Sequence, residues 1–194
     1  MLDSPTNNFA TFNPLAVSQS ASTFSEGNLK AVTPATGGGD AYGSFAIPST
    51  GKWYWEVYVT VANASFIGVS EYDQSQTYII NGSNHSGFYF NGNKYVDGTG
   101  SSYGSSYGAT DIISIAVDAD LGTINFYKNN TAQGSLSHTM SDMLPFVSDG
   151  SSSNSSTYIA NFGQDSSFAG TKTAQGNQDN NGIGDFYYAP PTGF

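Results

Sequence analysis

Apolar and polar residues alternate along several stretches of this chain, and this alternation constrains its fold more than any other feature. Side chains of a β-strand point to opposite faces in turn, so residues two apart share a face. Between residues 52 and 61, every second side chain is large and apolar: Trp53, Trp55, Val57, Val59 and Val61. No window of eleven or more residues has the i, i+3, i+4, i+7 spacing of an amphipathic helix. The segment is therefore predicted to be a long strand with one buried face.

Two hairpins are predicted further along the chain. Residues 88–95 contain an Asn-Gly pair between two aromatic-rich arms, which is typical of a hairpin turn. Residues 111–117 and 122–128 form the clearest hairpin, because both arms alternate and Gly122 can take a positive φ at the turn. The other predicted strands are residues 66–70, 143–148 and 157–162.

The segments between these strands are rich in Gly and Ser, at residues 36–39, 98–108, 149–156 and 170–184. Many short strands joined by such turns predict an all-β fold, an antiparallel two-sheet β-sandwich with almost no helix. The predicted core consists of Trp53, Trp55, Val57, Ile67, Ile113, Ile115, Val117, Ile124, Phe126, Phe146, Ile159 and Phe162.

The length of 194 residues fits one domain with attached segments. We expect a polar N-terminal arm at residues 1–25, because this stretch lacks clear alternation. The sandwich is expected at residues 26–170. An Asn- and Gly-rich loop and a closing segment are expected at residues 171–194.

The charge of the chain excludes several classes of partner. It has 15 acidic residues against 5 basic ones, all of them Lys, which gives a formal net charge of −10. Nucleic-acid binding needs cations against the phosphates, and an anionic membrane repels such a chain in the same way. No apolar run is long enough for membrane insertion, and the first residues lack the features of a signal peptide. The absence of Cys excludes disulfides and thiolate metal sites.

Five blocks of sequence resemble the SPRY domain family and occur in the same order. These blocks are Gly51–Val59, Ile67–Ser70, Asp111–Gly134, Pro145–Ser148 and Tyr158–Gln164. The third, DIISIAVDADLGTINFYKNNTAQG, is the most diagnostic, since an acidic turn joins two strands and the second ends in F-Y-K-N. The resemblance covers residues 42–168 and implies a concanavalin A-like sandwich (a jelly roll) that binds partners without catalysis.

The flanks carry a second, narrower resemblance. LDSPTNNFATFNPL near the start, STFSEGNLK at residues 22–30 and NQDNNGIGDFYYAPPTGF at the end are similar to the flanks of SPRY-containing proteins of tailed bacteriophages. This implies a component of the virion exterior, such as a tail fibre, an adhesin or a capsid decoration. Its expected partners are other virion proteins, copies of itself in a homo-oligomer, and a glycan or protein of the host surface.

Two functions are compatible with this resemblance, a structural component that makes protein–protein contacts and a lectin-like receptor-binding domain. Tyrosine beside Asn and Ser offers rigid amphipathic area with adaptable hydrogen bonds, which suits sugars and protein surfaces equally. The candidate ligand-binding residues lie in or beside polar loops: Tyr72, Tyr78, Tyr95, Tyr103, Tyr107, Tyr187 and Tyr188. The alternative is that these rings cover sheet edges or pack inward.

Catalytic patterns are weak in this chain. The pattern G-x-S-x-G occurs twice at residues 100–108, but no helix is predicted to follow, and GSSY repeats produce it in what reads as a flexible loop. A polysaccharide hydrolase, the natural enzyme alternative, needs two carboxyls flanking one bond. The strand with Glu56 has no second acid, and Asp118 and Asp120 fall in a hairpin turn. We therefore predict no enzyme and no catalytic residues, and we expect both histidines in surface loops.

The loop at residues 177–185 is a candidate calcium site, because oxygen-bearing side chains recur there at alternate positions. Its candidate ligands are Asn177, Asp179, Asn181 and Asp185. Two of them are neutral amides, and Tyr188 stands where an EF-hand places its bidentate Glu. The alternative is an Asx-rich turn whose side chains cap its own backbone. Ca²⁺ is thus the one candidate cofactor.

Overall fold

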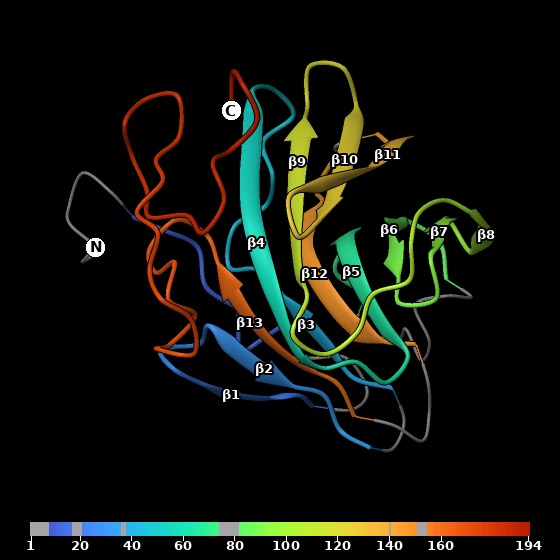
Figure 1. Ribbon diagram of the computed structural model, residues 1–194. Coiled ribbons are helices and arrows are strands. Elements are labelled where there is room, and N and C mark those ends of the chain that lie inside the picture. The colour runs from blue at the N-terminus through green and yellow to red at the C-terminus, as the bar shows by residue number, and fades with distance from the viewer. Residues whose placement is uncertain (1–7, 17–20, 36–37, 74–81, 140, 151–154) are drawn as a thin grey trace.

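The computed structural model describes residues 8–16, 21–35, 38–73, 82–139, 141–150 and 155–194. These residues form thirteen strands in two antiparallel sheets and contain no helix, as the alternation predicts. The sheets are the two layers of a β-sandwich (Figure 1). Within the described ranges, no helix has the length and apolar character needed to cross a membrane.

The seven-stranded sheet has the order β1 (Thr23–Ser25), β2 (Lys30–Val32), β13 (Thr157–Asn161), β4 (Lys52–Val61), β9 (Ile112–Asp118), β10 (Thr123–Lys128) and β11 (Thr131–Ser137). The six-stranded sheet has the order β3 (Asp40–Tyr42), β12 (Leu144–Asp149), β5 (Ser65–Ser70), β6 (His85–Tyr89), β7 (Asn93–Val96) and β8 (Thr99–Ser102).

Both predicted hairpins are confirmed. β9 pairs with β10 along its length, and Gly122 at the turn between them has a φ of 61°, which glycine adopts without strain. The Asp118 carboxylate accepts a hydrogen bond from the N–H of Leu121 and so fixes the same turn. β6 pairs with β7 around the Asn91-Gly92 turn.

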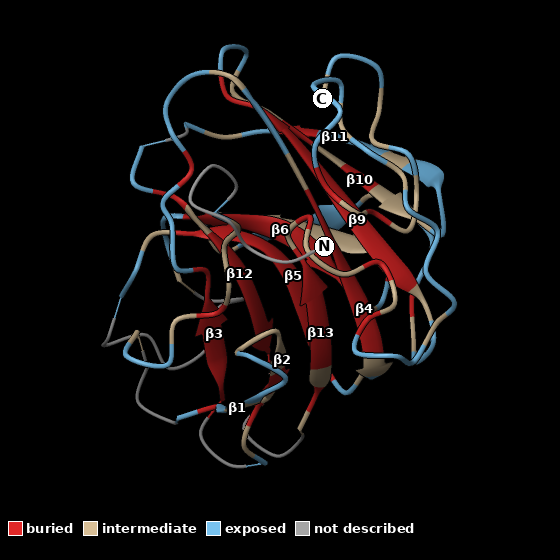
Figure 2. Cartoon of the chain, turned by 90° about the vertical axis from the view of Figure 1, so that its left-hand side faces the viewer, coloured by how far each residue is buried: buried red, intermediate tan, exposed pale blue. Residues whose placement is uncertain are grey.

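The core between the sheets contains most of the residues that the sequence predicts. Trp55 is 3% exposed, and the large side chains of both sheets pack around it in one cluster. Buried residues run along the strands, whereas exposed residues gather in the connecting loops (Figure 2). The predicted core residues that are buried are Trp55, Val57, Ile67, Ile113, Ile115, Val117, Ile124, Phe126, Phe146 and Ile159.

The seven-stranded sheet is covered on its outer face as well, so the prediction of a single buried face for β4 is wrong. Glu56 and Tyr58, on the outer face, are 0% and 8% exposed. Ile159 of β13 lies opposite Tyr58, and Phe168 packs against both from the segment that follows β13. Part of the predicted core therefore lies outside the layer between the sheets, because a C-terminal segment covers the second face.

The six-stranded sheet carries an aromatic cluster on its outer face. Phe146 of β12 contacts Tyr42 of β3 at a ring distance of 4.7 Å and Phe66 of β5 at 6.2 Å. His85 of β6 packs edge-on against Phe66 and is 0% exposed, and burial lowers its pKa to about 4. The expectation that both histidines lie in surface loops is thus wrong for His85.

Two predicted core residues are not buried. Trp53 is 41% exposed, because at the start of β4 a surface hollow faces it instead of a strand of the other sheet. Phe162 is half-buried directly after β13, where its ring packs edge-on against Phe12 at 6.0 Å. Alternation alone places both residues on the correct face, but it carries no information on where the opposite layer ends.

Five strands were not predicted, namely β1, β2, β3, β8 and β11. Four of them have only three or four residues, too short for alternation to be visible. β11 is an edge strand in which only Leu136 is buried. β8 lies within residues 98–108, which the sequence assigns to a loop.

The described part of the N-terminal arm packs on the sandwich. Phe12 is 1% exposed, donates its N–H to the carbonyl of Asn28 at 2.9 Å and forms an isolated bridge with Gly43. Its ring contacts Phe24 of β1. Phe12 therefore contributes to the core.

Replacing Trp55 by Ala is expected to lower the free energy of unfolding by about 3–5 kcal/mol, because a large side chain is lost from the core. Trp53→Ala is expected to cost less, about 1–2 kcal/mol, because that side chain is already 41% exposed. Urea denaturation of both variants measures the difference. Equal losses in the two variants would contradict the placement of these two rings.

Candidate functional site

Trp53 lies near the start of β4, where its ring is partly exposed and fixed by a hydrogen bond. It is the second residue of β4 and pairs with Val117 of β9. Its indole N–H donates to the carbonyl of Thr50 at 3.1 Å, which fixes the orientation of the ring. An exposed Trp in a defined orientation is the type of side chain that anchors protein interfaces.

An apolar hollow of about 390 Å³ opens on one side of Trp53. The segment before β4 contributes Phe45, Ile47 and Pro48 to its wall, and the N-terminal segment contributes Phe9. Phe9 lies directly over Gly163, whose position leaves no room for a side chain. The Gln164 side chain donates to the carbonyl of Ala10 at 2.8 Å and holds the same segment against the sandwich.

A second hollow of about 290 Å³ opens on the other side of Trp53. The C-terminal segment contributes Asp179, Ile183 and Phe186 to its wall, and Lys52 lines it as well. The Phe186 ring packs edge-on against Tyr54 at 5.0 Å. We call the two hollows together the Trp53 groove, since both are lined by Phe9, Trp53, Tyr54 and Phe162.

Exposed apolar side chains gather at this groove. Seven large apolar residues of the described chain are notably exposed, and three of them line the groove: Phe45, Trp53 and Ile183. A concentration of apolar surface on a soluble protein marks an interaction site more often than scattered exposed residues do. The Trp53 groove is therefore the candidate functional site.

Charges near the groove are mostly negative. The Lys52 ammonium pairs with the Asp118 carboxylate at 3.3 Å and lies over the Phe194 ring. Asp120 accepts the N–H of Gly51 at 3.2 Å. Asp118 and Asp120 thus hold the ends of β4 and β9 together, as expected for residues of a turn.

Glu56 is a buried carboxylate that fastens the C-terminal segment to the seven-stranded sheet. The backbone N–H groups of Tyr187 and Tyr188 each donate to one of its oxygens at 2.8 Å. The Asn161 amide donates to it at 3.1 Å from the neighbouring strand β13, and the Tyr54 hydroxyl donates at 3.1 Å. The carboxylate thereby satisfies backbone donors of a segment 131 residues away.

Two opposing effects act on the protonation of Glu56. Burial raises its pKa to about 7, because the charged form loses its hydration. The hydrogen bonds from Tyr188, Tyr187, Tyr54 and Asn161 lower the pKa, because they stabilise the carboxylate. Desolvation is the larger effect, so Glu56 changes its charge near neutral pH.

The predicted ligand-binding tyrosines do not form one surface. Tyr72, 44% exposed, packs edge-on against Tyr42, and Tyr95 is half-buried against Tyr89 and Phe66 on the outer face of the six-stranded sheet. Tyr187 and Tyr188 are half-buried on the outer face of the other sheet. Tyr78 lies outside the described residues. These tyrosines thus lie on two opposite faces of the sandwich.

Tyr103 and Tyr107 lie in the loop after β8, away from both of these faces. Tyr107 is buried, so it packs inward and offers little exposed surface to a ligand. Tyr107 is 4% exposed, and its hydroxyl donates to the carbonyl of Ser65 at 2.9 Å. Tyr103 is half-buried, its ring lies 5.5 Å from that of Phe88, and its hydroxyl donates to the carbonyl of Gly134. Both rings therefore pack against the core between the two sheets.

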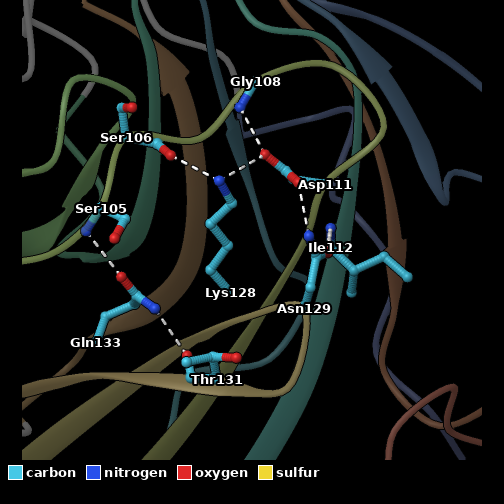
Figure 3. A network of polar contacts seen from close by, with 9 residues as sticks. All are labelled: Ser105, Ser106, Gly108, Asp111, Ile112, Lys128, Asn129, Thr131 and Gln133. Carbon is cyan, nitrogen blue, oxygen red and sulfur yellow. Dashed lines mark hydrogen bonds and ion pairs between the residues drawn. The ribbon is translucent and has the colours of Figure 1, made fainter.

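The loop that carries these tyrosines is tied to β10 and β11 by a polar network (Figure 3). The Lys128 ammonium donates to the carbonyl of Ser106 at 2.7 Å and pairs with the Asp111 carboxylate at 3.2 Å. Asp111 also accepts the N–H of Gly108 at 2.9 Å, and the Gln133 amide oxygen accepts the N–H of Ser105 at 2.8 Å. Residues 100–108, which the sequence assigns to a flexible loop, are thus bound to β10 and β11 by these contacts.

The candidate calcium ligands make hydrogen bonds within the protein. Asp179 accepts the N–H groups of Asn181 and Ile183 at 2.8 Å, as in an Asx turn. Asn177 donates its amide to the carbonyl of Tyr187 at 2.9 Å, and Asp185 accepts the hydroxyl of Ser166. Among the described residues, no three acidic, His or Cys side chains group as metal ligands. The contacts of Asp179 are those of the Asx turn that the sequence offers as the alternative.

The SPRY domain profile matches residues 52–165, from the start of β4 to just past β13. This chain belongs to the SPRY domain family. SPRY domains are generally protein–protein interaction modules and typically have no catalytic activity. No curated protein matches the chain.

Solved structures share the fold at low sequence identity. The SPRY domain of human HERC1 superposes with a TM-score of 0.64 at 21% identity, over 77% of this chain and 96% of that domain. The TRIM65 PSpry domain gives a TM-score of 0.61 at 14% identity, over 79% of this chain and 89% of that one. Stonustoxin gives 0.63 at 17% identity, over 79% of this chain but only 27% of its own. The likeness confirms the predicted sandwich.

Neither the groove nor the role of Glu56 follows from the alternation and motifs of the sequence. The groove residues Phe9, Phe45 and Ile183 come from segments without strand periodicity. Glu56 shares its face with Tyr54 and Tyr58 in a chain with only 10% charged residues. A single carboxylate between two aromatic rings is the signal that could have indicated a covered face.

Glu56 is expected to make the stability of the protein depend on pH. Because its pKa is raised from 4.5 to about 7 on folding, its contribution is full below pH 4.5 and is lost as the pH rises to about 7. The loss approaches about 1.4 kcal/mol for each unit of raised pKa. Urea denaturation between pH 4 and pH 8 of the parent and of Glu56→Gln measures this contribution as the difference between the two curves.

Glu26→Gln serves as the control, because Glu26 is exposed and far along the chain from this contact. Its curve is expected to run parallel to that of the parent. The carboxyl carbon shift of Glu56 in labelled protein reports the same titration without a substitution. A midpoint at or below the ordinary value would contradict the prediction.

Proposed function

We propose that this chain is a non-enzymatic binding module that holds a protein partner in the Trp53 groove. The observation that carries the proposal is the gathering of Phe45, Trp53 and Ile183, exposed and apolar, around two adjoining hollows. Interfaces draw most of their energy from a few such residues in partly enclosed positions. Membership of a family that generally mediates protein–protein contacts supports the same function.

We propose further that the module works on the exterior of a phage-like particle, as a tail fibre, an adhesin or a capsid decoration. The support is the resemblance of both flanks to SPRY-containing proteins of tailed bacteriophages. Other virion proteins, further copies of the chain in a homo-oligomer, and a host surface protein are the partners that this setting offers. Immunogold labelling of intact particles with antibodies to the chain tests the location.

Glycan binding is the second candidate function, and one observation favours it. The second hollow places Asp179 and Asn181 beside the exposed indole of Trp53, and a sugar ring can stack on an indole while its hydroxyls bond to such groups. The first hollow is mostly apolar, with Asn8 as a polar side chain in its lining, and this favours a polypeptide. Polysaccharide hydrolysis is the least supported alternative, since Glu56 is buried beneath the C-terminal segment.

Selection from a random peptide library displayed on yeast tests the groove. We expect binders whose affinity for the parent chain falls at least tenfold on Trp53→Ala, because the central anchor is lost. Leu121→Ala is the matched control, because Leu121 is 73% exposed and lies outside the groove. Binders that tolerate Trp53→Ala and respond to Leu121→Ala would place the site elsewhere.

A further inference from the structure

We infer that the partner of the Trp53 groove brings an extended segment in which a large apolar side chain neighbours Arg or Lys. This inference rests on the proposed function and specifies the chemistry of the partner. It follows from the charges of the chain and from the different linings of the two hollows.

The protein has little positive charge to offer a partner. It carries 15 acidic residues against 5 Lys, and four of those Lys are engaged within the chain. Lys52 and Lys128 form ion pairs with Asp118 and Asp111, while Lys94 and Lys172 lie over the rings of Tyr103 and Tyr58. An acidic partner would meet repulsion with few cations to offset it, so charge complementarity favours a basic one.

The same imbalance holds at the groove itself. Lys52, which lines the second hollow, is already paired with Asp118 at 3.3 Å, so this pair is close to neutral. Asp179 lines the second hollow, and Asp120 contacts the backbone two residues before Trp53. Within the described part of the chain, neither Asp179 nor Asp120 has an ion-pair partner. Asp179 therefore gives the groove a negative charge that a cationic partner can neutralise, and Asp120 adds a second one nearby.

The different linings of the two hollows favour a partner segment that has an apolar side chain next to a cationic one. The hollow lined by Phe9, Phe45 and Ile47 is apolar and suits an apolar side chain. Trp53 lies between it and the hollow that contains Asp179, with its ring held by the bond to Thr50. A cation of the partner can stack on the indole and face the carboxylate at the same time. An extended segment crossing Trp53 meets both requirements.

Three short peptides with blocked ends test this inference against the full chain. The first is Ala-Leu-Arg-Leu-Ala, the second has Glu in place of Arg, and the third has Ser in place of both Leu. Binding is read from tryptophan emission. Because Trp55 is 3% exposed, a change in emission on binding reports on Trp53.

We expect the Arg peptide to bind roughly tenfold more tightly than either of the other two. Raising NaCl from about 0.05 M to about 0.5 M is expected to shrink its advantage over the Glu peptide, because salt screens exposed charges. Asp179→Asn is expected to shrink it as well. This variant keeps the oxygen that accepts the N–H groups of Asn181 and Ile183, so the turn is preserved. Glu26→Gln, which removes an exposed charge outside the groove, is expected to leave the advantage unchanged.

Equal binding of the Arg and Glu peptides would overturn the inference, and so would an advantage that survives both salt and Asp179→Asn. A neutral oligosaccharide that changes the emission where no peptide does would overturn it too. The two proposals fail in different ways. Trp53-dependent binders that are neutral or acidic contradict only the basic partner, whereas a library without any Trp53-dependent binder contradicts the groove as well.

Discussion

The hydrogen bonds that Glu56 accepts join the C-terminal segment to the sandwich, and much of the outer layer depends on them. A carboxylate without water is costly to bury unless donors surround it. Here the donors come from strand β13, from β4 itself and from two consecutive backbone N–H groups of the C-terminal segment. The contact therefore does more than satisfy one charge, because it fixes where residues 187 and 188 lie on the sheet.

The position of this segment in turn determines the shape of the groove. Phe186 precedes the two residues bound to Glu56 and packs against Tyr54, so the wall of the second hollow is set by the same contact. Gly184 has a φ of 97°, and a side chain there would collide with the Phe186 ring. Glu56 in β4 and the turn at Gly184 thus both determine where Phe186 lies. The second hollow of the groove depends on both.

The sequence was sufficient for the architecture, since Trp55, Ile115 and Phe126 share a face by alternation and the structure buries all three. It was not sufficient to show at which residue of each strand the buried part begins and ends. Trp53 and Trp55 lie on the same face of β4, yet Trp53 is exposed and Trp55 is buried. The difference arises because the end of the opposing layer depends on contacts distant in sequence. Glu56 and Tyr107 were misplaced for the opposite reason. Alternation predicts an uncovered face for Glu56, and the Gly- and Ser-rich sequence around Tyr107 predicts a loop, whereas distant segments cover both side chains.

The Trp53 groove is built from both ends of the described chain, with Phe9 on one wall and Ile183 on another. During synthesis, the strands of the sandwich emerge from the ribosome before Ile183 does. A nascent chain that ends before Ile183 lacks the wall of the second hollow, whereas it already contains every residue that lines the first. The second hollow thus forms after the strands, because its wall depends on a segment that follows β13.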